Sequence, residues 1–259
     1  MKTDPFTRTP GVAGDAYIDM HYADKVLQSF QNKASSKYVF KIVGLRGSGK
    51  SVAYRKIFNA LSQEPGWRVY TLSAAGDPIN TLITNLSKEP FINDKTSSMT
   101  VTSGGVLEAN AWTIKDNADV GISQTIEKNT QCYSQEATLS KMIDKANASG
   151  YRVLVGVDDI AKTPEMGKFL SLWGAMLLED SKKIYLVCTG LAKNIEEFAD
   201  ESNLTFFKRS DCIEVGALDK FEIAAMYQRF LDVNETEATK LSKFTCGYAY
   251  AYQDVCCKG

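Results

Sequence analysis

The chain contains, at residues 39–51, the stretch Val39-Phe40-Lys41-Ile42-Val43-Gly44-Leu45-Arg46-Gly47-Ser48-Gly49-Lys50-Ser51. This stretch predicts a buried strand, a glycine-rich turn and the first turn of a helix, and it fits the phosphate-binding loop pattern G-x-x-x-x-G-K-[ST]. The pattern requires a strand before the loop and a helix after it, and an amphipathic run from Val52 to Leu61 is typical of that helix. The sequence therefore predicts an α/β fold with a nucleotide-binding site.

The residue types of this loop suit a polyphosphate. Several backbone N–H groups must point inward at once, which requires backbone angles that glycine adopts easily, and the following helix presents its unpaired N–H groups to the anion. The Lys50 ammonium adds a mobile charge at the β- and γ-phosphates, and the Ser51 hydroxyl can ligate Mg²⁺. The residues expected to bind ATP or ADP are Gly44, Arg46, Gly47, Ser48, Gly49, Lys50, Ser51 and Val52.

A second buried strand, residues 151–157, ends abruptly in two carboxylates. Its apolar run is typical of a central strand in a parallel sheet, and such sheets bind ligands at the carboxyl ends of their strands. We expect Asp158 to hold Mg²⁺ through a water, completing the metal shell begun by Ser51, and Asp159 to polarise the attacking water. The alternative is that the pair serves as an ordinary N-cap before Pro164.

Further catalytic candidates follow these two strands. Another apolar strand ends near Thr189, whose hydroxyl is expected to reach a γ-phosphate or its water; Asn194 competes for that role, with capping of a helix over 195–199 as its alternative. Arg209, before the last strand, is expected to neutralise charge in the transition state, for its own chain or for a neighbouring subunit. Its alternative is a surface pair with Asp211. The predicted catalytic set is Lys50, Asp159, Thr189 and Arg209.

The chain divides into three parts by pattern. Residues 1–36 form an N-terminal arm and helix, 37–217 a P-loop NTPase core with a parallel sheet between helices, and 218–259 a small helical lid. An inserted β-hairpin or meander is predicted over 91–126, where short strand-like runs alternate with turn signals. Residues 10–17 are expected either to wrap an adenine or simply to lead into the core.

Composition narrows the classes of function. The formal charge is −1 and 24% of residues are charged, so no basic field favours nucleic acid or an anionic membrane. The longest apolar run, Phe169–Leu178, is too short to span a bilayer, and no apolar region follows Met1 as in a secretory signal. Six cysteines without a C-x-x-C pair, and one histidine, His21, disfavour zinc and favour reduced thiols in a cytoplasm.

The order of these motifs resembles the additional-strand branch of P-loop ATPases, and more narrowly bacterial AAA-type and STAND-like ATPases related to replication initiators. The resemblance covers about Tyr38 to Gln253 and rests on residues 44–51, Asp158-Asp159, residues 188–191, residues 207–209 and residues 247–249. Two positions depart from the family pattern: Asp159 stands where initiators usually have glutamate, and Ala249 stands where the lid motif has proline. Such relatives continue into a winged-helix domain, so we expect the lid here to be truncated.

Three functions remain open from the sequence. The first is a Mg²⁺-dependent ATPase that acts as a molecular switch through a protein partner or a homo-oligomer, and the resemblance implies DNA contact only through a C-terminal domain beyond the lid. The second is a nucleotide-dependent interaction module with little hydrolysis, because the Asp159 carboxylate is one methylene shorter than that of glutamate. The third, a small-molecule kinase, usually has an arginine-rich lid, whereas Arg229 is the only arginine in this one.

Overall fold

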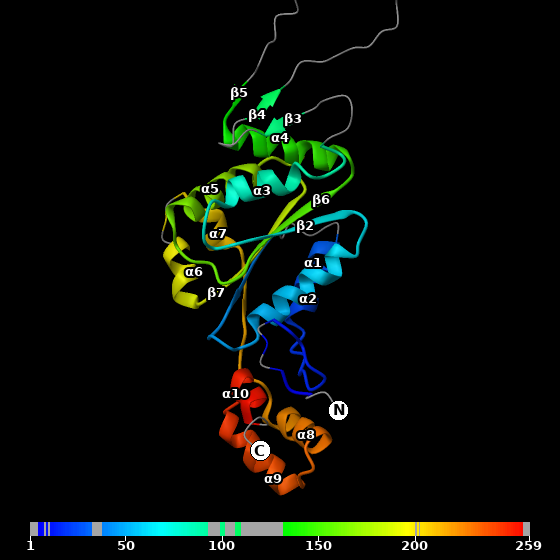
Figure 1. The fold of residues 1–259 in the computed structure, drawn as a ribbon. Coiled ribbons are helices and arrows are strands. Elements are labelled where there is room, and N and C mark those ends of the chain that lie inside the picture. The colour runs from blue at the N-terminus through cyan, green and yellow to red at the C-terminus, as the bar shows by residue number, and fades with distance from the viewer. Residues whose placement is uncertain are drawn as a thin grey trace, which may run out of the picture.

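A five-stranded parallel sheet forms the centre of the computed structural model (Figure 1). The structure describes residues 5–7, 9, 11–32, 38–92, 99–101, 107–109, 132–199, 201 and 203–255. The strands stand in the order β2-β6-β7-β1-β8, and their bounds are β1 Val39–Val43, β2 Trp67–Leu72, β6 Arg152–Val157, β7 Ile184–Gly190 and β8 Asp211–Glu214. The three inner strands are buried along almost their whole length, as their mainly apolar sequences predicted, and Lys41 in the middle of β1 is buried with them.

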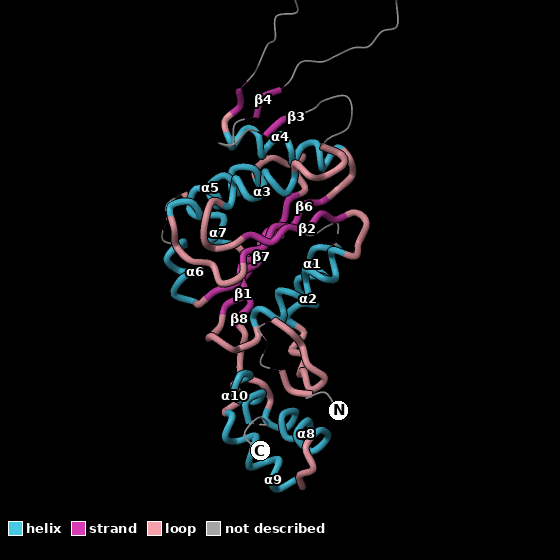
Figure 2. Tube along the Cα trace, viewed as in Figure 1, coloured by secondary structure: helices cyan, strands magenta, loops and turns pink. Residues whose placement is uncertain are grey.

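Helices cover both faces of this sheet (Figure 2). One face carries α1 Tyr22–Gln31 and α2 Lys50–Ser62, and the other carries α3 Pro78–Leu86, α4 Gln135–Ala148, α5 Pro164–Leu177, α6 Ala192–Ala199 and α7 Thr205–Arg209. Two separate hydrophobic clusters, one on each face, hold these layers to the sheet. The predicted α/β fold class is therefore confirmed, with the sheet between two helical layers.

The first residues of α5 and α6 show which of the predicted N-caps form. The α5 helix is capped by Thr163, whose hydroxyl accepts from the Met166 N–H at 3.1 Å, so the two aspartates before it do not serve as its N-cap. The predicted cap at Asn194 is wrong. The α6 helix already begins at Ala192, and the Asn194 amide instead donates to the Ile160 carbonyl at 3.2 Å, tying α6 to the loop after β6.

The insertion contains a small antiparallel sheet of three strands, β3 Met99–Val101, β4 Leu107–Ala109 and β5 Cys132–Tyr133. This agrees with the predicted β-meander, except that β5 lies beyond the predicted limit at residue 126. Residues 93–98, 102–106 and 110–126 of the predicted insertion lie outside the described residues.

Three short helices form the lid, α8 Lys220–Phe230, α9 Glu235–Thr245 and α10 Ala249–Asp254. Asp219 caps α8, and Asn234 forms a reciprocal capping box with Glu237 on α9. The N-terminal arm packs on one side of the lid, because Phe6, Ala16 and Ile18 share one buried cluster with lid residues Ile223, Tyr227 and Tyr252. Among the residues the structure describes, no helix has the length and apolarity needed to cross a bilayer.

Gly156 allows α2 to pack closely on β6. The phosphate loop precedes α2 and Asp158 follows β6, so this close packing sets the distance between them. A Cβ at this position would lie 2.0 Å from Phe58 Cζ and 2.4 Å from Tyr54 Oη, two rings that stack at 4.2 Å on α2. We expect Gly156→Ala to lower the free energy of unfolding by about 1–3 kcal/mol through overpacking, measured by urea denaturation. Gly66→Ala, with no atom within 4 Å, is the control; equal stabilities for the two variants would contradict this packing argument.

Candidate nucleotide-binding site

The carboxyl ends of β1, β6 and β7 lie side by side at one edge of the sheet. The registers pair Val43 with Gly190 and Val157 with Cys188, so the residues that follow each strand emerge together. The phosphate loop follows β1, Asp158 follows β6, and Thr189 is the second-last residue of β7. Segments that are more than a hundred residues apart in the chain are brought together at this edge, where open α/β sheets place their ligands.

A chain of hydrogen bonds joins the loop to the acidic pair. The Ser51 hydroxyl donates to Asp158 Oδ1 at 3.1 Å, and the Thr189 hydroxyl donates to the same oxygen. The Asp159 N–H in turn donates to Thr189 Oγ1 at 2.8 Å. Asp159 adopts the left-handed region with φ 55°, which is uncommon for a residue other than glycine and marks a constrained backbone at this strand end.

Thr189 contacts both aspartates of the site. Its side chain is fully buried, its one hydroxyl proton goes to Asp158, and its oxygen accepts from Asp159. The geometry therefore places Thr189 against the two aspartates, and its contact with a γ-phosphate or the attacking water stays a prediction.

Lys50 is folded back onto its own loop. Its Nζ donates to the Gly44 carbonyl at 2.9 Å and to the Leu45 carbonyl at 2.8 Å. Burial lowers the pKa of the Lys50 ammonium from its ordinary value, and the carboxylates of Asp159 and Asp158 act against that shift. The cation is thus held near two acidic side chains by hydrogen bonds that an incoming phosphate can replace.

The loop itself has the features of an anion cradle. Gly47 and Gly49 have φ angles of 72° and 100°, and no atom lies within 4 Å of the place a Cβ of Gly49 would occupy. Because Gly49 is also the N-cap of α2, no side chain covers the first N–H groups of that helix. The Ser48 hydroxyl is buried without a hydrogen-bond partner. An orphaned hydroxyl and open N–H groups fit a phosphate chain.

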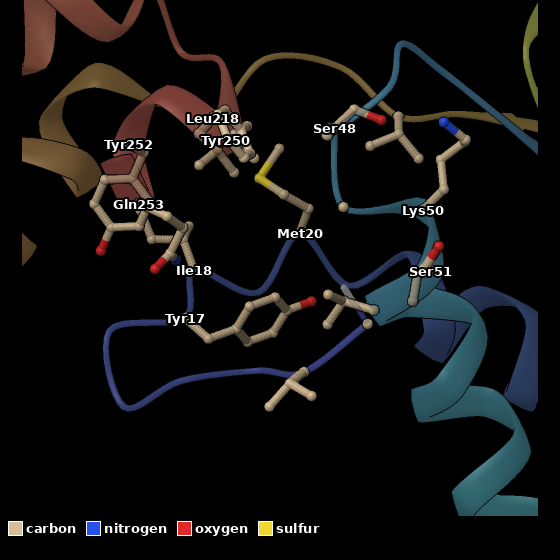
Figure 3. Close-up of a pocket in the computed structure, with 18 of the residues that line it drawn as sticks. Tyr17, Ile18, Met20, Ser48, Lys50, Ser51, Leu218, Tyr250, Tyr252 and Gln253 are labelled. Atoms are coloured by element: carbon tan, nitrogen blue, oxygen red, sulfur yellow. The ribbon is translucent and has the colours of Figure 1, made fainter. Parts of the chain in front are cut away.

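A cavity of about 320 Å³ lies against this loop. Figure 3 shows that its labelled side chains come from three segments: the arm, the phosphate loop with the start of α2, and the lid. Polar groups of the loop line one end, and the apolar wall includes Val12, Ile18, Met20, Leu218 and Tyr250. This division suits a molecule with an anionic tail and a flat, less polar head.

The arm is held at this cavity by hydrogen bonds to the lid. Tyr252 Oη of the lid donates to the Ala16 carbonyl at 2.6 Å, and the Thr7 N–H donates to Gln253 Oε1 at 2.8 Å. Gly11, Val12 and Tyr17 line the cavity, and Pro10 lies outside the described residues; contact of residues 10–17 with an adenine stays a prediction. No local pattern in the sequence distinguishes Met20, Tyr250 or Gln253, which also line the cavity.

Arg209 lies at the opposite end of the sheet from the phosphate loop. It precedes β8, which pairs in parallel with β1 from Phe40↔Asp211 to Val43↔Glu214. The five residues of β1 separate the two ends by roughly 13 Å along the strand, so Arg209 is not positioned to act on a nucleotide in its own chain. The buried Lys41 Nζ holds α7, the helix that ends at Arg209, by donating to the Phe207 carbonyl at 2.6 Å.

Comparison with known proteins supports the fold. No family model matches the sequence, and no curated protein matches it. Among solved structures, the ADP form of the Aeropyrum pernix ORC2 protein matches with a TM-score of 0.52 at 11% identity, over 91% of this chain and 63% of that one. Cdc6p from Pyrobaculum aerophilum matches with a TM-score of 0.54 at 12% identity, over 94% and 62%. Domain III of the Thermotoga maritima replication initiation protein DnaA matches with a TM-score of 0.51 at 12% identity, over 98% and 88%.

At these identities the likeness establishes the fold alone. The chain spans less than two thirds of the length of the first two proteins. The α/β architecture, with a parallel sheet between helices, is the one that these proteins share.

Proposed function

We propose that the protein binds ATP with Mg²⁺ and hydrolyses it as an AAA-type molecular switch. The observation that carries the proposal is the hydrogen bond from Ser51 to Asp158, which joins a phosphate-loop helix to an acidic strand end 107 residues away. Few other functions require a hydroxyl at the start of a helix to meet a carboxylate beside a glycine-rich loop. The ADP form of the Aeropyrum pernix ORC2 protein, which has this fold, adds support.

In this proposal the chain's own groups have distinct tasks. The N–H groups of the loop and α2 bind the phosphates, and Lys50 leaves the carbonyls of Gly44 and Leu45 to contact them. Ser51 and Asp158 would hold Mg²⁺, which supplies neutralisation of charge on the phosphate oxygens when bound. Asp159 orients the attacking water and accepts its proton, and Thr189 keeps the aspartate pair in place.

Arg209 is proposed to act on the nucleotide of a neighbouring copy. It lies at the far end of the sheet from its own cavity, so a contribution to phosphoryl transfer requires a head-to-tail arrangement of subunits. An arginine supplied by a second subunit is a common device for stabilising charge in this reaction. DNA contact is proposed only through a C-terminal domain beyond the lid; the Aeropyrum pernix ORC1 protein with this fold is in complex with DNA, and the chain spans 59% of it.

A second candidate is an interaction module that binds nucleotide and hydrolyses little of it. The distance of Arg209 from its own cavity favours it, because an isolated chain would lack that cation. A kinase is less well supported: Arg229 packs with its guanidinium 5.2 Å from the Phe230 ring, and Lys50 is the only basic residue among the described ones that line the cavity.

A single-turnover assay of phosphate release at increasing protein concentration tests the proposal. We expect the rate to rise with concentration, and Arg209→Ala to bind ATP as the native chain does but to release phosphate about 10³-fold more slowly. Mixing Arg209→Ala with Lys50→Ala should restore turnover, because the second variant supplies the arginine and the first binds the ATP.

Three outcomes decide between the candidates. Bound ATP that stays intact at every concentration supports the interaction module. A rate that is independent of concentration and unchanged in Arg209→Ala contradicts the role in a neighbouring subunit. Denatured protein that never releases ATP or ADP, detected by mass spectrometry, contradicts nucleotide binding itself.

A further inference from the structure

The lid touches the phosphate loop through one side-chain hydrogen bond. Tyr248, at the N-cap of α10, donates from its hydroxyl to the Arg46 carbonyl, 202 residues away in the chain. Within the described part of the lid, no other side chain bonds to residues 44–51. A Cβ on Gly47 would lie 2.7 Å from Tyr248 Oη and 2.8 Å from Tyr250 Cβ, so the lid rests directly against the loop at this glycine.

This hydrogen bond fixes the direction of one peptide group. The Arg46 carbonyl and the Gly47 N–H belong to the same planar peptide, and none of the described peptides is cis, so the two groups point in opposite directions. Because the lid holds the Arg46 carbonyl, the Gly47 N–H points away from the Tyr248 hydroxyl. A peptide flipped the other way would present its carbonyl oxygen, and repel an anion.

The neighbouring carbonyls of the loop are held differently. Those of Gly44 and Leu45 accept from Lys50 Nζ, which must leave them to contact a phosphate. The Arg46 carbonyl does not depend on Lys50, since its partner belongs to the lid. Tyr248 therefore keeps its hold on the loop while Lys50 changes partners.

Tyr248 follows a turn that backbone hydrogen bonds hold on both sides. Gly247 has φ 76°, and its carbonyl accepts from the Leu218 N–H at 2.8 Å, while the Tyr248 N–H donates to the Thr245 carbonyl at 2.8 Å. A Cβ on Gly247 would lie 2.6 Å from the Leu218 carbonyl oxygen. Any displacement of this turn, and of α10 after it, would withdraw the Tyr248 hydroxyl from the loop.

We propose that Tyr248 is a positioning residue for the phosphates: its hydroxyl holds the Arg46–Gly47 peptide so that the Gly47 N–H is available to the β- and γ-phosphates, which couples lid closure to recognition of the phosphate chain. This inference rests on the proposed nucleotide-binding function. It predicts that the hydroxyl matters for ligands with a β-phosphate and not for the nucleoside part.

The test compares Tyr248→Phe with the native full chain, measuring the affinities of ATP and ADP by calorimetry and of AMP by competition. Loss of one hydrogen bond should weaken ATP and ADP about two- to ten-fold and leave AMP unchanged. Tyr38→Phe is the matched control, because Tyr38 is 37% exposed against 36% for Tyr248 and lies at the other end of β1. It should bind all three ligands as the native chain does.

The outcomes separate this inference from the function on which it rests. Native protein that binds no ATP overturns both. Native binding with an unchanged ATP affinity in Tyr248→Phe overturns the role of the hydroxyl alone. An equal loss for ATP and AMP also overturns it, because that result indicates general disturbance of the cavity.

Discussion

Replacement of Lys50 by alanine is expected to abolish detectable binding of ATP and ADP, with a loss of affinity of about two orders of magnitude or more. Lys50 is the only basic residue among the described ones that line the cavity, and its Nζ lies in the loop itself, on the Gly44 and Leu45 carbonyls. Without it the phosphates lose their one charge-assisted donor from a side chain. Calorimetric titration with Mg²⁺-ATP measures the effect.

The same substitution should leave the fold intact. Burial lowers the pKa of the Lys50 ammonium, because burial disfavours the charged form. Lys168→Ala is the control, since Lys168 pairs with Glu136 at 2.8 Å on an exposed surface between α4 and α5. If Lys50→Ala binds ATP as tightly as Lys168→Ala, the phosphate-loop assignment is wrong.

Asp159→Asn is expected to bind Mg²⁺-ATP normally and to hydrolyse it about 10²- to 10⁴-fold more slowly, the usual contribution of a positioned general base. Asparagine tolerates the left-handed backbone that Asp159 adopts at φ 55°, so the exchange removes the charge without adding strain. The Asp159 N–H that donates to Thr189 is also retained. Phosphate release in a single turnover measures the effect.

Two further variants sharpen this result. Asp158→Asn should weaken the Mg²⁺ dependence of binding as well, because Asp158 meets the Ser51 hydroxyl at 3.1 Å where the metal is proposed to bind. Asp180→Asn, an exposed aspartate after α5, should match the native chain in both measurements. Hydrolysis by Asp159→Asn at the native rate would remove Asp159 from the mechanism.

The sequence by itself determined the fold class and the chemistry of the loop. Residues 39–51 carry a strand, a glycine turn and a helix start within thirteen positions, and all three are local signals. The strand before Asp158 could also be predicted from its sequence, because a strand buried on both faces must be apolar until it reaches the edge of the sheet. Local signals did not predict the exact ends of elements: α6 begins at Ala192, so Asn194 lies inside the helix and is not its N-cap.

Only the tertiary structure decided how distant parts combine around the site. Phe6 of the arm packs with Tyr227 of the lid, and the Thr189 hydroxyl forms hydrogen bonds with the two aspartates. Tyr248 forms a hydrogen bond with Arg46, 202 residues away in the chain. Such contacts leave no periodicity in the sequence, since they depend on which surfaces meet after the helices and strands have formed. The same holds for Arg209, whose distance from its own cavity follows from the parallel pairing of β8 with β1.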